Sequence, residues 1–296
     1  MDKAGIGRKI FHQLMIYTVN TISILFLLLP LVALLFGSVQ TEKDLAIDVQ
    51  NPLPNRITFI NFVRLFQGGD VEASVASYVP PNMDYLGRAF FNSTFVSLTV
   101  TLAILVLGSL SAYSISRLRE RWTTAFLYIS LATRLLPVMT LMVPLYIALR
   151  GFHMLNSLTG IIITEIGFLI PYAIWILTSF FATLPRGLED AARIDGCTRI
   201  QVLYRIILPL STPGIASCGV IIFIMSWNEL VIPLVVSTQP QVMTIPVLLA
   251  GLTGDRYLFY TLMMAICLIA LTPTVILALL LRKYVVRGLR AGALKG

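Results

Sequence analysis

The sequence predicts an all-α membrane protein with six transmembrane helices and both termini in the cytoplasm. The first observation is the composition: 57% of the 296 residues are hydrophobic and 12% are charged, whereas about a quarter of the residues in a soluble domain are charged. The second is a series of apolar runs that reach the roughly 20 residues needed to cross a bilayer. The third is the position of the basic residues, most of which lie on one side of those runs.

Six apolar runs define the expected spans, and together they form one transmembrane domain, 1–296. The first run follows a basic leader that contains Lys3, Arg8 and Lys9. This run is longer than a signal-peptide core and precedes no A-x-A cleavage site, so we expect an uncleaved span. The polar, turn-rich stretch 37–87 is expected to be a partly structured external loop, either a tether or a surface for a partner. The expected spans are 14–36, 90–115, 123–149, 158–182, 206–236 and 258–281.

The positive-inside rule decides the predicted topology. An even number of spans puts both termini on one side of the membrane. With the N-terminus inside, fifteen Lys and Arg residues fall in the inner segments and six in the outer segments, while Arg134 falls within a span. The polar segment 184–209 is therefore predicted to be cytoplasmic. The formal net charge of +8 reflects this bias at the span ends and does not predict a nucleic-acid partner.

Several classes of chemistry are absent from the sequence. The three cysteines have no C-x-x-C or metal-binding spacing, and two of them lie in apolar runs. With only two histidines, the chain cannot form an H-E-x-x-H metal site. No G-x-x-x-x-G-K-[ST] motif occurs, so the chain has no P-loop for ATP. We therefore expect no catalytic residues, no metal site and no cofactor site in this chain.

The segment 184–209 has the features of a helix-loop-helix docking surface between two spans. Pro185 suits the first position of a helix. Gly196 can adopt the positive φ that ends a helix. Thr198 and Gln201 have the spacing of a capping box, which opens a second helix.

The first of these helices should present a shallow face to a partner. Glu189 and Arg193 are placed to form an i,i+4 ion pair along it. Beyond the second helix, Pro209 and Pro213 each remove a helical hydrogen bond and are expected to kink the start of the fifth span, which either passes movement into the membrane or merely shapes the helix. The residues expected to share the docking face are Leu188, Ala191, Ala192 and Asp195.

Charged and aromatic residues inside the spans are the candidates for a substrate pathway. A charge at the centre of a span costs about 2.5–3.5 kcal/mol, so Arg134, Glu165 and Glu229 need partners. We expect Arg134 and Glu165 to pair across neighbouring helices. An aromatic face beside polar groups suits a sugar, with ordinary helix packing or an interfacial position as the alternative. The aromatic and polar candidates are Tyr172 and Trp175 in the fourth span, and Trp227, Asn228 and Glu229 in the fifth.

The spacing in the polar segment resembles a family motif. Asp190-Ala191-Ala192 is followed after three residues by Gly196, after nine more by Ile206 and after one more by Leu208-Pro209. This series is similar to the EAA loop of permease subunits of binding-protein-dependent ABC importers. Asp190 stands where the family usually has Glu, and Glu189 precedes it, so the acidic character is kept with a shorter reach. The stretches 89–94, 133–137, 227–229 and 286–296 resemble the carbohydrate-importer branch of maltose-transporter, MalG-like permeases.

The resemblance implies a type I ABC importer permease of the MetI/MalG-like class. Such a subunit moves a sugar or oligosaccharide from a solute-binding protein into the cytoplasm by alternating access. The implied ATPase-coupling residues are Leu188, Glu189, Asp190, Ala191, Ala192, Asp195, Gly196, Ile206, Leu208 and Pro209. The implied binding-protein contacts are Gln239, Pro240, Gln241, Gly254 and Asp255, and the tail 291–296 is expected to meet the ATPase pair.

The resemblance also implies a multi-subunit assembly in a bacterial or archaeal plasma membrane. The implied partners are a second homologous permease, two ATPase subunits, an extracytoplasmic solute-binding protein, the lipid bilayer and a carbohydrate substrate. ATP and Mg²⁺ would be bound by the ATPase subunits, so this chain would not itself be an enzyme.

Other functions stay open at this point. The same type of importer could carry polyols, sugar phosphates or acidic oligosaccharides such as alginate. A channel or secondary transporter would use Glu165 and Glu229 as ion sites. An intramembrane enzyme would need a convergent nucleophile and base, for which the sequence offers no motif.

Overall fold

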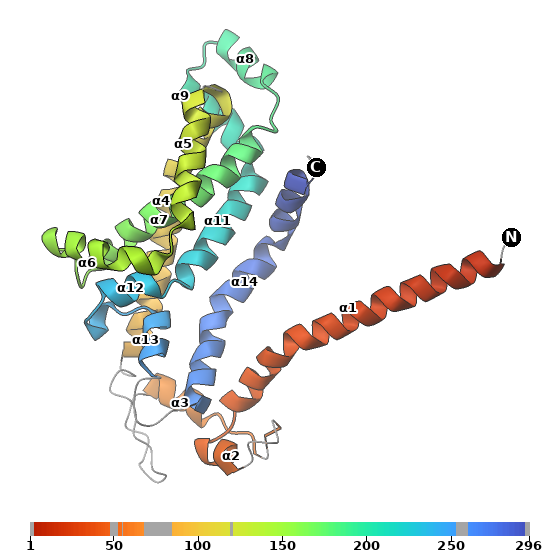
Figure 1. Ribbon diagram of the computed structural model, residues 1–296, viewed down its shortest axis with the longest axis vertical. Coiled ribbons are helices and arrows are strands. Elements are labelled where there is room, and N and C mark those ends of the chain that lie inside the picture. Colours follow the sequence, from red (N-terminus) through yellow and green to blue (C-terminus); the bar gives the residue numbers. More distant parts are fainter. Residues whose placement is uncertain are drawn as a thin grey trace. The chain divides into compact units, whose positions relative to one another are not determined.

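A computed structural model describes residues 3–47, 53–54, 56–67, 85–118, 121–252 and 260–293. Every regular element in these ranges is a helix (Figure 1). The chain forms two compact units. The first comprises Met1–Met83 with Leu252–Ala270, and the second comprises Asp84–Gly251 with Leu271–Gly296. The last helix, α14 (Tyr260–Ala293), contributes to both units.

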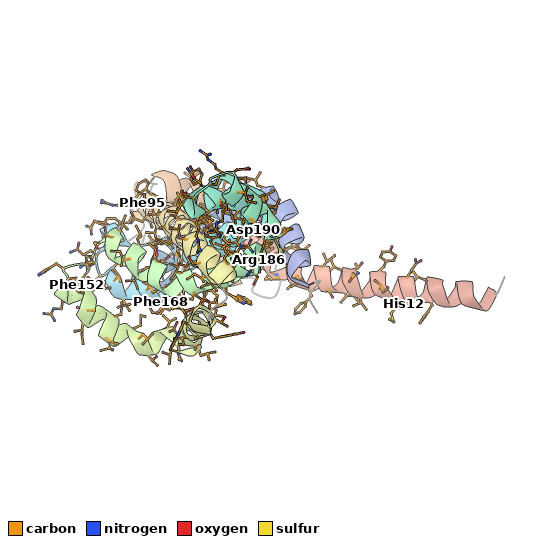
Figure 2. All side chains as sticks on the ribbon, turned by 90° about the horizontal axis from the view of Figure 1, so that it is seen from above. His12, Phe95, Phe152, Phe168, Arg186 and Asp190 are labelled. Atoms are coloured by element: carbon orange, nitrogen blue, oxygen red, sulfur yellow. The ribbon has the colours of Figure 1, made fainter. Side chains whose placement is uncertain are left out.

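The first unit contains α1 (Lys3–Ser38), α2 (Glu42–Ile47), α3 (Ile60–Gln67) and the beginning of α14. The expected external loop 37–87 therefore holds two short helices. Asn61 donates from its amide to the Ser38 carbonyl at 2.9 Å. The Glu42 carboxylate accepts from the backbone N–H of Thr261 at 2.6 Å and from its hydroxyl at 2.8 Å. Residues 11–33 of α1 are all exposed, with side chains on every side of the helix (Figure 2).

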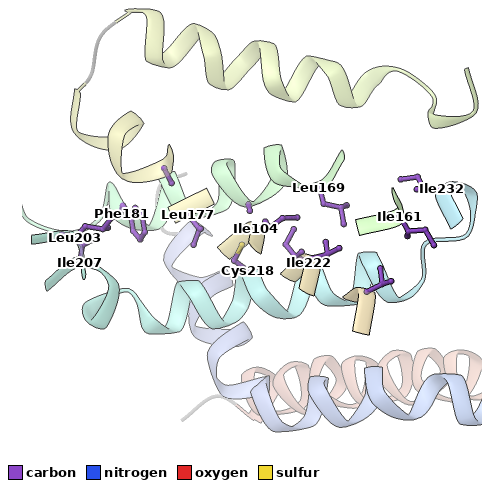
Figure 3. Packing of buried hydrophobic residues seen from close by; sticks show 14 of the residues in the cluster. Ile104, Ile161, Leu169, Leu177, Phe181, Leu203, Ile207, Cys218, Ile222 and Ile232 are labelled. Carbon is purple, nitrogen blue, oxygen red and sulfur yellow. The ribbon is translucent and has the colours of Figure 1, made fainter. Parts of the chain in front are cut away.

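The core of the second unit forms where α4 (Leu86–Leu118), α7 (Leu158–Phe181) and α11 (Thr212–Trp227) pack together. Figure 3 shows side chains of all three helices meeting there, and Ile104 and Cys218 are fully buried. Small residues allow close approach, as is typical of membrane helices. A methyl group added to Gly108 would lie 3.2 Å from the Ala173 Cβ.

Two helices of the second unit are sharply bent. The path from α5 (Arg121–Ala132) into α6 (Met142–Gly151) turns by 92° between Leu135 and Val138. Leu136 precedes a proline and is extended there, with φ −75° and ψ 126°, because the proline ring disfavours helical geometry in the preceding residue. The second bend, of 81°, lies between Leu210 and Thr212.

The count of spans depends on these bends. Four helices in the described ranges are long and apolar enough to cross a membrane: Phe11–Ser38, Leu86–Arg117, Leu158–Phe181 and Tyr260–Leu280. The number rises to six if each bent pair forms one span, which agrees with the predicted six. The range expected for the fifth span, 206–236, is divided, because α11 ends at Trp227 and a separate helix, α12, covers Val231–Val236.

The second unit has two distinct ends. The short helices α8 (Gly187–Ile194) and α9 (Arg199–Val202) lie at one end of α4, α5 and α11. At the opposite end lie α12 and α13 (Ile245–Gly251) (Figure 1). The predicted cytoplasmic segment and the predicted binding-protein loop are thus at opposite ends of this unit.

Candidate functional site

The end of the first helix and the start of the second fold as predicted, but Pro185 does not occupy the first helical position, because α8 begins at Gly187 with Arg186 as its N-cap. Gly196 has φ +84°. The Cys197 N–H donates to the Ala192 carbonyl at 2.9 Å and the Gly196 N–H to the Arg193 carbonyl at 3.1 Å, the pair of bonds that defines a Schellman end. The predicted capping box is also confirmed: the Gln201 N–H donates to the Thr198 hydroxyl, and the Thr198 N–H to the Gln201 side chain.

The exposed face of α8 differs in part from the predicted one. Leu188, Ala191 and Asp195 are exposed as expected, but Ala192 is buried against the core. The sequence analysis missed Ile194, which is 86% exposed. The signal was available, since an isoleucine in a polar helix three residues after Ala191 belongs to the same face.

The two neighbouring carboxylates of α8 point to different places. Glu189 forms an ion pair with Arg117 at the end of α4 instead of with Arg193, and both paired side chains are 11% exposed. The Tyr113 hydroxyl also donates to Glu189, at 3.1 Å. Asp190 is exposed at this end of the unit (Figure 2). Glu189 therefore attaches α8 to α4, and Asp190 is the carboxylate that a partner can reach.

A π turn follows α9 and precedes the second bend. Leu203–Ile207 forms this turn, with Leu203 and Ile207 buried and Ile206 partly exposed. Leu208 is partly exposed and Pro209 is exposed just before the bend of 81°. The kink predicted from Pro209 and Pro213 is therefore present, and π turns of this kind are frequent at functional sites.

The loop at the opposite end is held by neutral side chains. The Asn156 side-chain oxygen accepts from the Thr238 N–H at 2.7 Å, the Thr238 hydroxyl at 2.9 Å and the Gln239 N–H at 3.1 Å. Asn92 donates to the carbonyls of Gln241 and Met243 at 3.0 and 2.9 Å.

Asn92 and Asn156 were not predicted to shape this loop. Asn92 lies in a family-like stretch, which was the available signal. Among the predicted contacts in the loop, Gln239 and Gln241 are exposed and Pro240 is partly exposed. Gly254 and Asp255 lie outside the described residues, as does half of the predicted tail contact 291–296, residues 294–296.

The predicted group at Trp227 makes its contacts within the chain. Trp227 is 3% exposed and stacks on Phe223 with ring centroids 5.8 Å apart. Asn228 donates to the Ile224 carbonyl at 2.8 Å. The Glu229 carboxylate accepts from the N–H groups of α12 at Val231, 3.0 Å away, and at Ile232, 3.2 Å away. These contacts end α11 and begin α12.

The expected pair between Arg134 and Glu165 does not form, so this prediction was wrong. Glu165 instead accepts a hydrogen bond from the Ser226 hydroxyl of α11. Arg134 donates to the Gly167 carbonyl at 3.4 Å, and its guanidinium lies 4.9 Å from the Phe168 ring centroid.

The two predicted pathway residues of α7 remain accessible to different degrees. The Tyr172 ring centroid lies 6.0 Å from the Arg134 guanidinium, and its side chain is partly exposed. Trp175 is 51% exposed.

Known proteins resemble this chain over most of its length. The sulfoquinovosyl glycerol transport permease SmoH of Agrobacterium fabrum is 31% identical over 91% of this chain and 89% of its own. The trehalose permease SugB of Mycobacterium tuberculosis is 30% identical over 82% and 84%. The trehalose/maltose permease MalG of Thermococcus litoralis is 35% identical over 69% and 74%.

Solved structures share the fold. A chain of a bacterial ABC transporter that imports the acidic polysaccharide alginate matches 96% of this chain and 98% of its own, with a TM-score of 0.75 and 20% identity. A chain of the MetNI methionine ABC transporter matches 71% and 99%, with a TM-score of 0.56 and 17% identity. The model of the "binding-protein-dependent transport system inner membrane component" matches residues 104–291. The chain therefore belongs to this family of transport permeases.

Proposed function

We propose that the chain is the membrane-spanning permease subunit of an ATP-driven importer for a sugar or oligosaccharide. The relatives named above are permeases for trehalose, maltose and a sulfosugar glycoside, which supports a carbohydrate as the transported class. The importer would reside in the plasma membrane of a bacterium or archaeon and alternate between outward-facing and inward-facing states. ATP and Mg²⁺ would be bound by separate ATPase subunits.

The observation that carries this proposal is the exposed face of α8, held by a closed helix end and a buried ion pair. A short helix that presents Leu188, Ala191 and Ile194 has the small and apolar side chains that suit a groove in a partner. We propose that this face seats in an ATPase subunit and that Asp190 contributes the charged contact.

The proposed importer would contain two further protein partners. A second homologous permease would complete the pathway, and an extracytoplasmic solute-binding protein would meet the exposed Gln239 and Gln241. Trp175 and Asn228 are exposed and Tyr172 and Glu229 are partly exposed, so these four pathway candidates have accessible side chains. Trp227 would support them through packing, because it is buried.

A cross-linking experiment tests the docking of α8. Cys197 follows the end of α8 and is partly exposed as a free thiol, whereas Cys218 is buried. A cysteine placed in the groove of the ATPase should cross-link to Cys197 in membranes, and Cys197→Ser should abolish the product. Cys218→Ser is the matched control and should leave the yield unchanged. If no position in the ATPase groove gives a product that depends on Cys197, the docking proposal fails.

A transport assay tests the function as a whole. The complex purified with its partner subunits should, in proteoliposomes, take up the ligand of its cognate binding protein only with ATP and with that binding protein present. Uptake that persists without the ATPase subunits would instead indicate a channel or a secondary transporter.

A further inference from the structure

A basic cavity lies between α8 and the end of α4, and it shares Asp190 with the proposed docking surface. It has a volume of about 400 Å³ and is formed by the end of α4, by α8 and by α9 with the turn that follows. Two carboxylates, Glu189 and Asp190, also line it, so the guanidinium groups exceed the carboxylates by two. We call it the arginine cavity, after Arg117, Arg186, Arg193 and Arg199.

One of these guanidinium groups has a buried donor without an acceptor. The Nε of Arg117 faces Glu189 in the ion pair. The Nη2 of the same arginine is buried and makes no hydrogen bond within the described part of the chain. A buried donor of this kind is unfavourable and rare in folded proteins. Because Arg117 lines the cavity, an anion bound there would be attracted by its guanidinium, and a small shift of the side chain would bring Nη2 within reach.

The remaining charges of the cavity favour an anion as well. Arg186 donates to the Arg117 carbonyl at 3.5 Å, which brings a second guanidinium to the end of α4. Arg193 and Arg199 are exposed, and neither forms an ion pair within the described residues. Among the described residues that line the cavity, Asp190 is the one carboxylate left to balance the three arginines outside the Glu189 pair. Guanidinium groups bind phosphate with paired hydrogen bonds, which makes phosphate the best-matched anion.

The position of the cavity adds a second property of the ligand. Arg117 is the last residue of the apolar span Leu86–Arg117, so in a bilayer the cavity would lie at or beyond the edge of the hydrocarbon, at the level of the headgroups. Its wall includes Leu110, which is 47% exposed, and Ile200, which is 69% exposed. A ligand with a phosphate group and an apolar part could contact both the arginines and this apolar wall. The predicted cytoplasmic leaflet is also the one that attracts basic residues through its anionic lipids.

We propose that the arginine cavity binds a phosphate-bearing anion, with Arg117, Arg193 and Arg199 as its ligands. The headgroup of an anionic phospholipid and a free phosphate compound share this chemistry. A lipid bound here would contact the ion pair that holds α8, so the lipid composition of the membrane would influence how firmly the docking helix is attached. The cavity adjoins the docking face at Asp190, and the inference does not require that the substrate be a sugar.

Arginine modification in the purified complex tests the proposal and separates the two sources. Phenylglyoxal reacts with free guanidinium groups, and mass spectrometry reports the rate at each arginine. The complex is measured in detergent alone, with phosphatidylglycerol, with phosphatidylcholine and with inorganic phosphate. We expect phosphatidylglycerol to slow modification at Arg193 and Arg199 by about fivefold or more, because each guanidinium would be held in a hydrogen bond to the bound phosphate. Arg150, which is exposed at the end of α6, is the internal control and should react at one rate throughout.

Every outcome of the modification experiment either supports the proposed phosphate site or overturns it. Protection by phosphatidylglycerol alone identifies a lipid headgroup, and protection by inorganic phosphate in detergent identifies a soluble phosphate site. Equal protection by phosphatidylcholine, protection by no additive, or slow modification before any addition would overturn the proposal. The last result would mean that a partner subunit covers the cavity.

Variants give an independent readout. Arg193→Gln combined with Arg199→Gln should weaken the binding of spin-labelled phosphatidylglycerol by roughly fivefold for each arginine removed. Arg150→Gln should leave that binding unchanged. Both variants keep the Arg117–Glu189 pair, so a folding defect is not expected, and transport activity is not the measured quantity.

Discussion

The two ends of the second unit are attached to its core by different chemistry. At the α8 end, one buried ion pair between Glu189 and Arg117, with the Tyr113 hydroxyl, holds the docking helix. At the opposite end, neutral amides and hydroxyls hold the loop around Gln239 at several points. Removing one partner of a buried ion pair leaves the other charge unpaired and is strongly destabilising. Removing one of several neutral hydrogen bonds costs much less stability. We conclude that one ion pair dominates the polar attachment of the docking helix, whereas the attachment of the loop is divided among several neutral hydrogen bonds.

Glu189→Ala is expected to give the largest loss of stability at the α8 end. It leaves the Arg117 guanidinium buried without its carboxylate, which costs up to about 3–5 kcal/mol when a buried pair is broken on one side. Hydrogen exchange at the amides of α8 should rise steeply and ATP-driven uptake should fall. Asp190→Asn is the matched control on the same helix and should leave exchange in α8 unchanged. If the two variants give the same exchange, the ion pair does not hold α8.

A smaller but clear effect is expected for Asn156→Ala at the other end. Two backbone N–H groups, of Thr238 and Gln239, lose their acceptor, which should cost about 2 kcal/mol at roughly 1 kcal/mol for each bond, and alanine is also less favourable than asparagine at φ 54°. Faster hydrogen exchange at the amides of Thr238 and Gln239 would measure this loss of stability. Asn156→Asp keeps the accepting oxygen and tolerates the φ of 54° at this position, so it should behave like the unmodified chain. A large loss with Asn156→Asp would mean that the side-chain N–H₂ group is the essential one.

Tyr113→Phe sharpens the comparison at the α8 end. The substitution removes only the hydroxyl that donates to Glu189 and leaves the ion pair intact. A hydrogen bond to a charged group contributes about 1.5 kcal/mol at the lower end of its range. Exchange in α8 should therefore rise much less than in Glu189→Ala. An equal rise would show that the hydroxyl, and not the charge of Arg117, fixes the carboxylate.

The smallest effect is expected for Ser93→Ala. The Ser93 hydroxyl accepts from the Ile245 N–H at 2.8 Å, and its loss should cost about 1 kcal/mol. The Asn156 and Asn92 contacts remain, so the loop should stay ordered and exchange should rise at Ile245 alone. Loss of order throughout the loop would contradict a distributed attachment.

The features that could be predicted from the sequence depend on nearby residues. The Gly196 helix end, the Thr198–Gln201 capping box and the bend beside Pro209 each arise from the conformational preferences of a few consecutive residues. The bias of basic residues predicts a cytoplasmic position for the segment 184–209, which stays a prediction. These predictions needed no knowledge of how the helices pack.

The features that could not be predicted depend on distant partners. Glu189 and Asp190 are adjacent acidic residues, and only the position of Arg117, on another helix, decides which one is buried. Glu165 meets Ser226 of α11, and Arg134 meets Gly167, because the break at Pro137 sets where α5 ends against α7. Similar depth in two spans was therefore not sufficient to predict a pair.

The π turn at Leu203–Ile207 constrains how this chain can be recombined with its relatives. The Leu208 N–H donates to the Leu203 carbonyl, so this turn holds one residue more than an α-helical turn. Removing one residue, for instance the half-exposed Tyr204, would allow a regular helix and rotate the preceding segment by about 100° relative to α11. A chimaera that exchanges the loop between permeases must therefore conserve the length between Gly196 and Pro209 as well as the motif residues themselves.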